Sequence, residues 1–334
     1  MMTYAIAITA GFLTAFLVSW LVRRGGVLDH PNNRSSHRQP TPRSGGLGVM
    51  AGIAACVTVW TVVGSVPPHA AVPLAVMAAA GLLGLIDDLI APGPSEKFLS
   101  LLAISLAAAF AAGPIGVIET GAFALALPFA IGLAGTALWV FVAINTVNFA
   151  DGSNGLVALS MAMAGLGLTL VSGEPEGVFL SVALLGFLPW NFPSARLFLG
   201  DVGSLAVGGW FAVAGLNAVM GGSAVSVFLV PLLMLPLLVD ILLTMLGRVR
   251  AGFKMTHPHR SHAYQLLVRM GLPHWRVAVL YAALSGWCVI VALVAHALGG
   301  AWPLTGLVVM TLVLSLAHSR LRASARAKGL DMGE

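Results

Sequence analysis

Two adjacent carboxylates at the end of an apolar segment are of a type and spacing that could do chemistry. The segment Gly-Leu-Ile-Asp-Asp-Leu carries Asp87 and Asp88. An acid at the centre of a membrane helix costs about 2.5–3.5 kcal/mol, and two neighbouring charges of one sign also repel each other. Such a pair usually needs a cation or a proton-transfer role, although the end of an interfacial helix is the simpler alternative.

Two further acids lie in segments rich in amides and glycines. Asn145 and Asn148 are three residues apart and share a helical face, and Asp151 and Asn154 follow in a turn. A turn with a helix cap would explain one of these residues rather than all of them. Asp201, between two glycines, could simply favour a helix N-terminus, or it could approach a phosphate or metal ion.

Basic residues accompany the acids. Lys97 is the only cation in its loop, and residues 29–46 mix turn formers with arginines. The late loop 257–265 carries His257, His259, Arg260 and His262. Histidines can bind a metal, but here contact with phosphate is the stronger interpretation, and a solvated basic loop is the structural alternative. Asp240 lies inside an apolar segment. Such an acid is expected either to have a function or to pair with a buried structural partner.

Long apolar segments must position these clusters. The chain has 334 residues, of which 58% are hydrophobic and 9% charged, against about 25% charged in soluble domains. This composition predicts an all-α polytopic membrane protein with about 11 transmembrane helices of roughly 20 residues each. The expected spans are 4–22, 45–66, 71–90, 97–113, 131–149, 155–172, 177–192, 203–221, 226–246, 275–297 and 302–320. Segment 113–131, broken by Gly and Pro, predicts a surface hairpin or a re-entrant piece.

The charges orient these spans. All 17 Lys and Arg fall in alternate loops or at the span ends facing them, and the opposite loops carry Glu119, Glu174 and Glu176. The excess of positive charge in cytoplasmic loops places the N-terminus outside and the C-terminus in the cytoplasm. Residues 1–320 then form a single transmembrane domain, and 321–334 a basic cytoplasmic tail. This topology accounts for the net charge of +5 without nucleic acid, and it places every polar cluster on the cytoplasmic side.

Together the clusters supply what phosphoryl transfer requires. Carboxylates and phosphate oxygens bind Mg²⁺, and Lys and Arg neutralise the charge that develops on phosphate. A secondary transporter is the alternative, but its site would lie near the bilayer midplane, and the sequence has no internal repeat. The sequence leaves open whether the protein is a monomer or a homodimer, because apolar residues facing lipid and those facing a partner look alike.

Four motifs, in order, resemble those of one enzyme family across nearly the whole chain. LIDDL, NTVNFADGSNGL, FLGDVGSL and HPHRSHAYQ are similar to the polyprenyl-phosphate N-acetylhexosamine-1-phosphate transferase superfamily (glycosyltransferase family 4). The resemblance implies a catalytic membrane domain in the bacterial inner membrane, in contact with membrane lipid, whose active site faces the cytoplasm. It also implies transfer of a sugar phosphate from a UDP-sugar to undecaprenyl phosphate with release of UMP. The implied cofactor is Mg²⁺, with Mn²⁺ as the alternative.

The resemblance also implies roles for individual residues. By motif position, these are Asp201 and Asn148 for the metal, Asp87, Asp88 and Asp151 for catalysis, Asn154 and Asn145 for the nucleotide, and Lys97, His257, His259, Arg260 and His262 for phosphate. Which Asp is the base, and whether the reaction takes one step or passes through a covalent intermediate, stays open.

The late loop bears on the identity of the sugar. Arg260 and Ser261 interrupt the run of histidines that the phospho-MurNAc-pentapeptide translocases carry. The pairing of RSSH…PTPRSGG with HRSHAYQ instead resembles the branch that initiates O-antigen with UDP-N-acetylfucosamine or a related 6-deoxy sugar. UDP-GlcNAc and UDP-MurNAc-pentapeptide are the alternatives.

Overall fold

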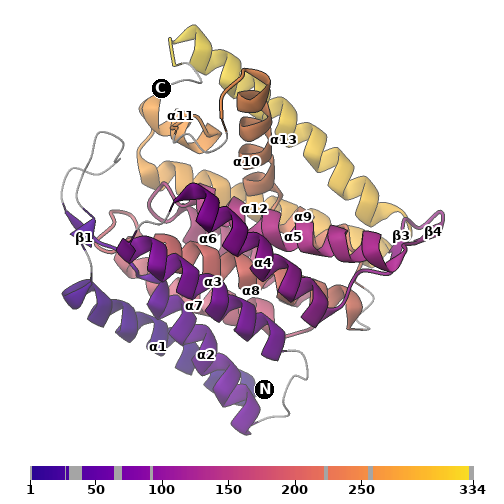
Figure 1. Cartoon of the computed structure of the whole chain (residues 1–334), viewed down its shortest axis with the longest axis horizontal. Coiled ribbons are helices and arrows are strands. Elements are labelled where there is room, and N and C mark those ends of the chain that lie inside the picture. Colours follow the sequence, from indigo (N-terminus) through magenta and orange to yellow (C-terminus); the bar gives the residue numbers. More distant parts are fainter. Residues whose placement is uncertain are drawn as a thin grey trace.

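The molecule is a bundle of apolar helices, given by a computed structural model that describes residues 2–26, 28–29, 40–63, 70–90, 93–221, 225–254 and 259–330 (Figure 1). Within these ranges, 8 helices are long and apolar enough to cross a membrane. They are α1 (Met2–Gly25), α2 (Gly46–Val63), α3 (Ala71–Ile90), α4 (Pro94–Ala112), α5 (Phe129–Ala150), α8 (Gly200–Met220), α12 (His274–Leu298) and α13 (Trp302–Ala327). The predicted class, an all-α polytopic membrane protein, is confirmed.

Three expected spans correspond to shorter helices. Two are α6 (Leu156–Ser172) and α7 (Glu176–Asn191), which are apolar but below spanning length. The third, 226–246, is divided at Met234 into α9 (Leu229–Leu233) and α10 (Leu235–Arg250). Pro236 lies in the first turn of α10, where a proline without an N–H is tolerated, whereas it would disrupt a helix interior. The number of 11 spans and their orientation remain predictions.

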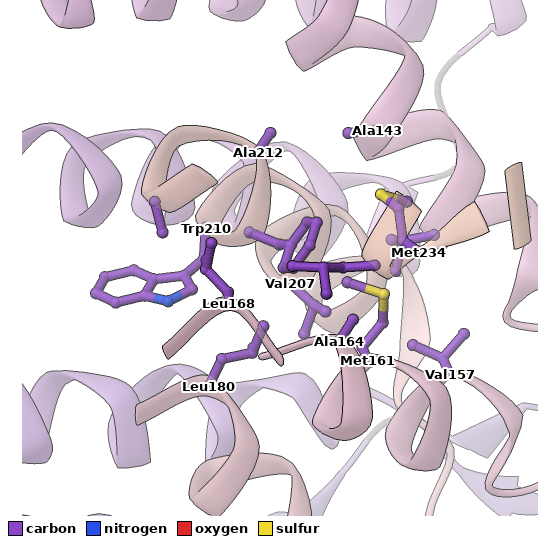
Figure 2. Close-up of a cluster of buried hydrophobic side chains, with 14 of the residues drawn as sticks. Ala143, Val157, Met161, Ala164, Leu168, Leu180, Val207, Trp210, Ala212 and Met234 are labelled. Carbon is purple, nitrogen blue, oxygen red and sulfur yellow. The ribbon is translucent and has the colours of Figure 1, made fainter. Parts of the chain in front are cut away.

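Helix α8 is the centre of the bundle. Of its most apolar 18 residues 89% are buried, against 17–44% in the other seven long helices. It packs along α3 and α5, and it also contacts α2, α6 and α7. Figure 2 shows part of this core, in which Trp210 and Val207 of α8 lie against Met161 and Leu168 of α6. The first turn of α8, which carries Asp201, is therefore surrounded by the ends of other helices.

A glycine brings α3 unusually close to the start of α8. A Cβ atom on Gly84 would lie 2.2 Å from the Asp201 carbonyl oxygen and 2.5 Å from the Val202 nitrogen. Asp87 and Asp88 follow Gly84 by three and four residues and so share its side of α3. The two acids consequently reach the first turn of α8.

Two small hairpins lie at opposite ends of the molecule (Figure 1). Segment 113–131 forms the surface hairpin that was one of its two predicted forms, with β3 (Val117–Glu119) antiparallel to β4 (Ala124–Ala126). At the other end, β1 (Leu28–Asp29) pairs with β2 (Thr41–Pro42) beside the polar clusters.

Helix α13 and the short helix α11 complete the end that carries the polar clusters. α11 (Ala263–Arg269) follows the late loop, and α13 continues to Ala327, beyond the expected domain boundary at residue 320. Arg322 of α13 is buried and donates to the Ser261 carbonyl oxygen at 2.8 Å. The last helix therefore packs against the late loop.

Candidate active site

A polar cavity of about 650 Å³ lies where the ends of the helices meet. Its lining comes from segments far apart in the sequence, including the ends of α3 and α5, the start of α8, and α11. The charged residues that line it are Asp29, Arg43, Asp87, Asp88, Asp151, Asp201, Arg260 and Arg269. The acids predicted to converge therefore do share one cavity.

Asp88 is held by the segment just before α2 and by the first turn of α8. It accepts hydrogen bonds from Ser44 Oγ at 3.2 Å and from the backbone N–H groups of Asp201 at 3.3 Å and Val202 at 3.4 Å. N–H groups in a first helical turn have no partner within their own helix, so the carboxylate satisfies them. Arg43 adds a hydrogen bond to the Asp88 carbonyl oxygen and lies 3.9 Å from its Oδ1.

The turn that presents these N–H groups requires a glycine. Gly200 has φ +75°, and a Cβ atom there would lie 2.6 Å from Asp88 Oδ2. Only glycine combines this left-handed backbone with such a close approach. Gly200 thus allows the Asp88 carboxylate to approach the first turn of α8, beside Asp201.

Lys97 bridges two of the acids. Its Nζ lies 2.7 Å from Asp87 Oδ2 and 2.5 Å from Asp201 Oδ2. The other oxygen of Asp201 accepts a 2.8 Å hydrogen bond from Asn148 Nδ2, which also lies 2.9 Å from Ser204 Oγ. Both oxygens of Asp201 are therefore fixed in direction, and a cation lies between two carboxylates.

Asp151 lies just beyond the end of α5 and has a perturbed acidity. Burial, followed by the negative charges of Asp201 and Asp88, raises the pKa of its carboxyl well above the usual range, and a hydrogen bond from the Gly200 backbone opposes this shift. The carboxyl group therefore keeps its proton to a higher pH than an ordinary aspartate. A carboxyl group poised in this way can exchange a proton with a substrate in the cavity.

The carboxylates of the cavity fit a divalent cation whose remaining ligands would be oxygens of a substrate. Among the described residues, no three His, Cys, Asp or Glu side chains are arranged to bind a metal by themselves. Mg²⁺ usually takes one or two carboxylates and completes its shell with water and substrate phosphate oxygens. Asp87 and Asp201 already hold a cationic ammonium group between them, so this place favours positive charge.

The structure brings most of the predicted site residues together. Asp87, Asp88, Asp151, Asn154, Asp201 and Arg260 line the cavity, and Lys97 and Asn148 contact Asp201. Asn145 is not brought to it, because its amide donates to the Phe141 carbonyl oxygen of the same helix at 2.8 Å. His257 lies outside the described residues. The individual roles remain predictions.

The two described histidines of the late loop are not among the residues that line the cavity. His259 Nδ1 is 2.9 Å from Ser261 Oγ, and the buried His262 ring stacks on Tyr264. Burial and neighbouring positive charges lower the pKa of His259 to about 3. Burial also lowers the pKa of His262 to about 4, although Asp240 opposes the shift. Both rings are neutral near pH 7, so Arg260 supplies the positive charge among the described residues of this loop.

Asn191 and His274 also line the cavity, although neither was predicted as a site residue. Asn191 ends α7, accepts from the Gly155 N–H at 2.6 Å and donates to the Leu197 carbonyl oxygen at 3.0 Å, which ties the start of α6 to the loop before α8. A polar residue at the end of an apolar segment was the available signal. His274 Nδ1 lies 2.8 Å from Ser153 Oγ, and no sequence pattern indicated that contact.

This fold and site define a class: a polytopic membrane protein with an acidic, phosphate-compatible cavity at one end of its helices. The family model described as glycosyl transferase family 4 matches residues 70–219, which include Asp87, Asp88, Asp151 and Asp201. The decaprenyl-phosphate N-acetylglucosaminephosphotransferase of Mycolicibacterium smegmatis is 31% identical over 316 residues, covering 82% of this chain and 77% of the relative. The chain therefore belongs to glycosyl transferase family 4, the polyprenyl-phosphate N-acetylhexosamine-1-phosphate transferases, as its motifs predicted.

Other relatives agree with this placement. A probable undecaprenyl-phosphate N-acetylglucosaminyl 1-phosphate transferase of Bacillus subtilis is 27% identical, with 86% of this chain and 83% of the relative covered. A phospho-N-acetylmuramoyl-pentapeptide-transferase of Desulforudis audaxviator is 28% identical, with 75% and 85% covered.

Proposed function

We propose that this protein transfers a sugar-1-phosphate from a UDP-N-acetylhexosamine to undecaprenyl phosphate, releasing UMP and leaving a lipid-linked diphosphate sugar. The observation that carries the proposal is the convergence of Asp87, Asp88, Asp151 and Asp201 with Arg43 and Arg260 on one cavity. The names of the similar proteins, which combine a polyprenyl phosphate with an N-acetylhexosamine phosphate, support the same reaction.

The proposed step exchanges one diphosphate bond for another. An oxygen of the lipid phosphate forms a bond to the phosphorus that carries the sugar, while the bond from that phosphorus to the bridging oxygen breaks and UMP leaves. The ionised phosphate groups repel each other, so the site must supply positive charge. Lys97, Arg43 and Arg260 are placed to supply it, and Asp87 or Asp88 would orient the attacking phosphate.

The proposed cofactor is Mg²⁺, with Mn²⁺ as the alternative. Asp201, oriented by Asn148, and Asp87 would hold the ion together with substrate oxygens. When bound, the ion would neutralise charge on the transferred phosphate. Because Lys97 lies between the same two acids, its ammonium group and the ion would share their negative charge.

The proposed location is the bacterial inner membrane, with the cavity open to the cytoplasm. The cavity lies at the end of the molecule where Arg43, Lys97, Arg260 and Arg269 gather, and positively charged segments favour the cytoplasmic side. This orientation would let a soluble UDP-sugar reach the acids directly.

The sugar is proposed to be N-acetylglucosamine or N-acetylfucosamine. The first is supported by the printed names of the M. smegmatis and B. subtilis relatives. The second, with a role in initiating O-antigen, is supported by the paired motifs RSSH…PTPRSGG and HRSHAYQ. The interrupted histidine run argues against a pentapeptide-bearing sugar.

A direct assay tests the proposal. Purified protein would be incubated with undecaprenyl phosphate, MgCl₂ and, in parallel, UDP-GlcNAc, UDP-N-acetylfucosamine or UDP-MurNAc-pentapeptide, and UMP and the lipid product would be measured. We expect UMP release that requires the lipid phosphate and the divalent ion, with one of the first two sugars preferred. Absence of UMP release with every donor would overturn the proposal.

A further inference from the structure

Asp240 is a buried carboxylate that the proposed reaction does not use. It lies on α10 and is 3% exposed. It is not among the residues that line the cavity. A buried acid in such a place is costly unless it is well hydrogen-bonded, so its partners indicate what it does.

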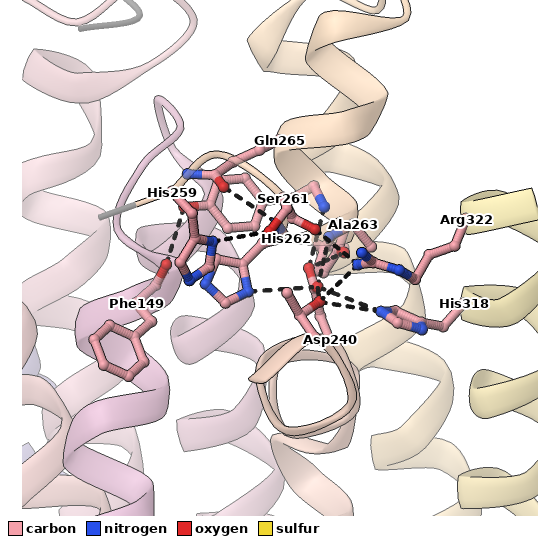
Figure 3. Close-up of polar contacts among 12 residues, drawn as sticks. Phe149, Asp240, His259, Ser261, His262, Ala263, Gln265, His318 and Arg322 are labelled. Atoms are coloured by element: carbon pink, nitrogen blue, oxygen red, sulfur yellow. Dashed lines mark hydrogen bonds and ion pairs between the residues drawn. The ribbon is translucent and has the colours of Figure 1, made fainter. Parts of the chain in front are cut away.

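Asp240 holds the start of α11. Its Oδ1 accepts from the Ala263 N–H at 2.6 Å, and its Oδ2 accepts from the Tyr264 N–H at 3.1 Å (Figure 3). These are the first two N–H groups of α11, which lack partners within the helix. The Tyr281 hydroxyl of α12 donates to the same Oδ2 at 2.6 Å. One side chain of α10 thus joins α11 to α12.

A second group of contacts joins the last helix to the same loop. Arg322 of α13 donates to the Ser261 carbonyl oxygen at 2.8 Å and to Thr244 Oγ1 at 3.3 Å. Thr244 lies one turn after Asp240, and its hydroxyl is 3.2 Å from His318 Nε2. Figure 3 shows Arg322 and His318 approaching Asp240 from the α13 side. The loop is therefore fixed on the side that faces away from the cavity.

The opposite side of the same segment forms a wall of the cavity. Arg260, Gln265, Val268 and Arg269 line it. The Tyr264 hydroxyl donates to the Phe149 carbonyl oxygen at 2.9 Å, two residues before Asp151. The position of α11 relative to the acids therefore depends on the contacts that Asp240 makes on the other side.

We propose that Asp240 is a positioning residue that holds segment 260–269 so that Arg260 and Arg269 face the diphosphate of the nucleotide sugar. The proposal rests on the proposed function for its substrate. Asp240 acts by accepting hydrogen bonds from two backbone N–H groups, one on each of its side-chain oxygens. The amide of asparagine could accept only through its single oxygen, so one of these contacts would be lost.

The first test separates KM from kcat. In Asp240→Asn we expect KM for the UDP-sugar to rise about tenfold or more, with a smaller change in kcat, because misplaced arginines lose contacts made in both ground and transition states. Tyr281→Phe, which removes one contact, should shift KM in the same direction by less. A loss of kcat alone at unchanged KM would overturn the proposal.

A double-mutant cycle distinguishes positioning from general destabilisation. If Asp240 acts through Arg260, adding Asp240→Asn to Arg260→Ala should raise KM much less than it does in the parent protein. Fully additive effects on KM would contradict the proposal. The control is Ser181→Ala, which removes a buried hydrogen bond between α7 and α6 far from the loop and should leave KM at the parent value.

Hydrogen–deuterium exchange tests the holding contact without turnover. Peptides covering 259–270 should exchange faster in Asp240→Asn than in the parent, and those from α3 and α8 should be unchanged, because only the former lose a partner. An unchanged rate of hydrogen–deuterium exchange at 259–270 would contradict the proposal even if activity fell. If the parent releases no UMP, the proposed function fails, whereas the exchange measurement still decides whether Asp240 holds the loop.

Discussion

Asp201 and Asp88 occupy different places in the candidate site: Asp201 belongs to the first turn of α8, and Asp88 of α3 contacts that turn. Asp88 is 4% exposed and accepts hydrogen bonds from the first turn of α8. Asp201 is partly exposed, and its oxygens meet Lys97 and Asn148. Asp88 lines the cavity but uses its oxygens largely on the first turn of α8, whereas Asp201 offers more of its carboxylate to a substrate. Asp201 is therefore the better candidate for direct contact with metal or phosphate.

Changing either acid to its amide should abolish most of the activity. We expect Asp201→Asn and Asp88→Asn each to lower kcat at least about 100-fold, which is typical for the loss of a preorganised electrostatic group. The measurement is UMP release with saturating donor and lipid phosphate. Glu174→Gln, a matched change of an exposed acid at the opposite end of the molecule, should leave kcat unchanged. Near-parental turnover in both Asp variants would refute the site assignment.

Asp151 should link activity to stability and pH. Its raised pKa means that the folded protein keeps the proton more tightly than the unfolded chain. The resulting stability is present below the ordinary Asp pKa of about 4 and is lost as the pH rises toward the folded pKa. Asp151→Asn, which cannot ionise, should therefore have a higher Tm than the parent near pH 7 in Mg²⁺-free buffer.

The pH series supplies the control for this prediction. The difference in Tm between Asp151→Asn and the parent should shrink as the pH falls to about 4, because the parent carboxyl is then protonated. The same variant should lose turnover. A lower Tm than the parent at pH 7 would show that the ionised carboxylate is stabilised in the folded protein, contrary to the expectation.

At the scale of elements, the site depends on how closely α3 approaches α8. Gly84→Ala places a methyl group 2.2 Å from the Asp201 carbonyl oxygen, and backbone atoms cannot rotate away as a side chain can. We expect a loss of about 1–3 kcal/mol in stability, typical of overpacking, and a loss of turnover as Asp87 and Asp88 move from Asp201.

A second glycine gives a matched comparison. A Cβ atom on Gly135 of α5 would meet no atom within 4 Å, and alanine is favoured over glycine in helices by up to about 1 kcal/mol. Gly135→Ala should therefore be neutral or stabilising in thermal denaturation. Equal Tm values for Gly84→Ala and the parent would argue against the close helix contact.

The sequence predicted elements better than side-chain directions. Apolar length and Gly-Pro breaks placed the helices and the β3–β4 hairpin, because these patterns reflect local physics. The division of 226–246 at Met234 was missed, since Pro236 in an apolar segment is compatible with a kinked helix. The hydrogen bond of the Asn145 amide back to its own helix and the burial of His262 depend on tertiary packing, which no local pattern contains.

At the scale of the whole molecule, positive charge alternates from one loop to the next. This alternation implies that the β3–β4 hairpin and the end of α13 face opposite sides of the membrane.

Ala122 and Lys328 are both exposed, and the native Cys56 and Cys288 are buried, so single introduced cysteines would report their own location. With an outward N-terminus, Ala122→Cys should react with a membrane-impermeant maleimide in spheroplasts. Lys328→Cys should react only after the membrane is permeabilised. The parent protein, treated identically, gives the background. Labelling of Lys328→Cys but not of Ala122→Cys in intact spheroplasts would invert the topology and place the cavity away from cytoplasmic UDP-sugars.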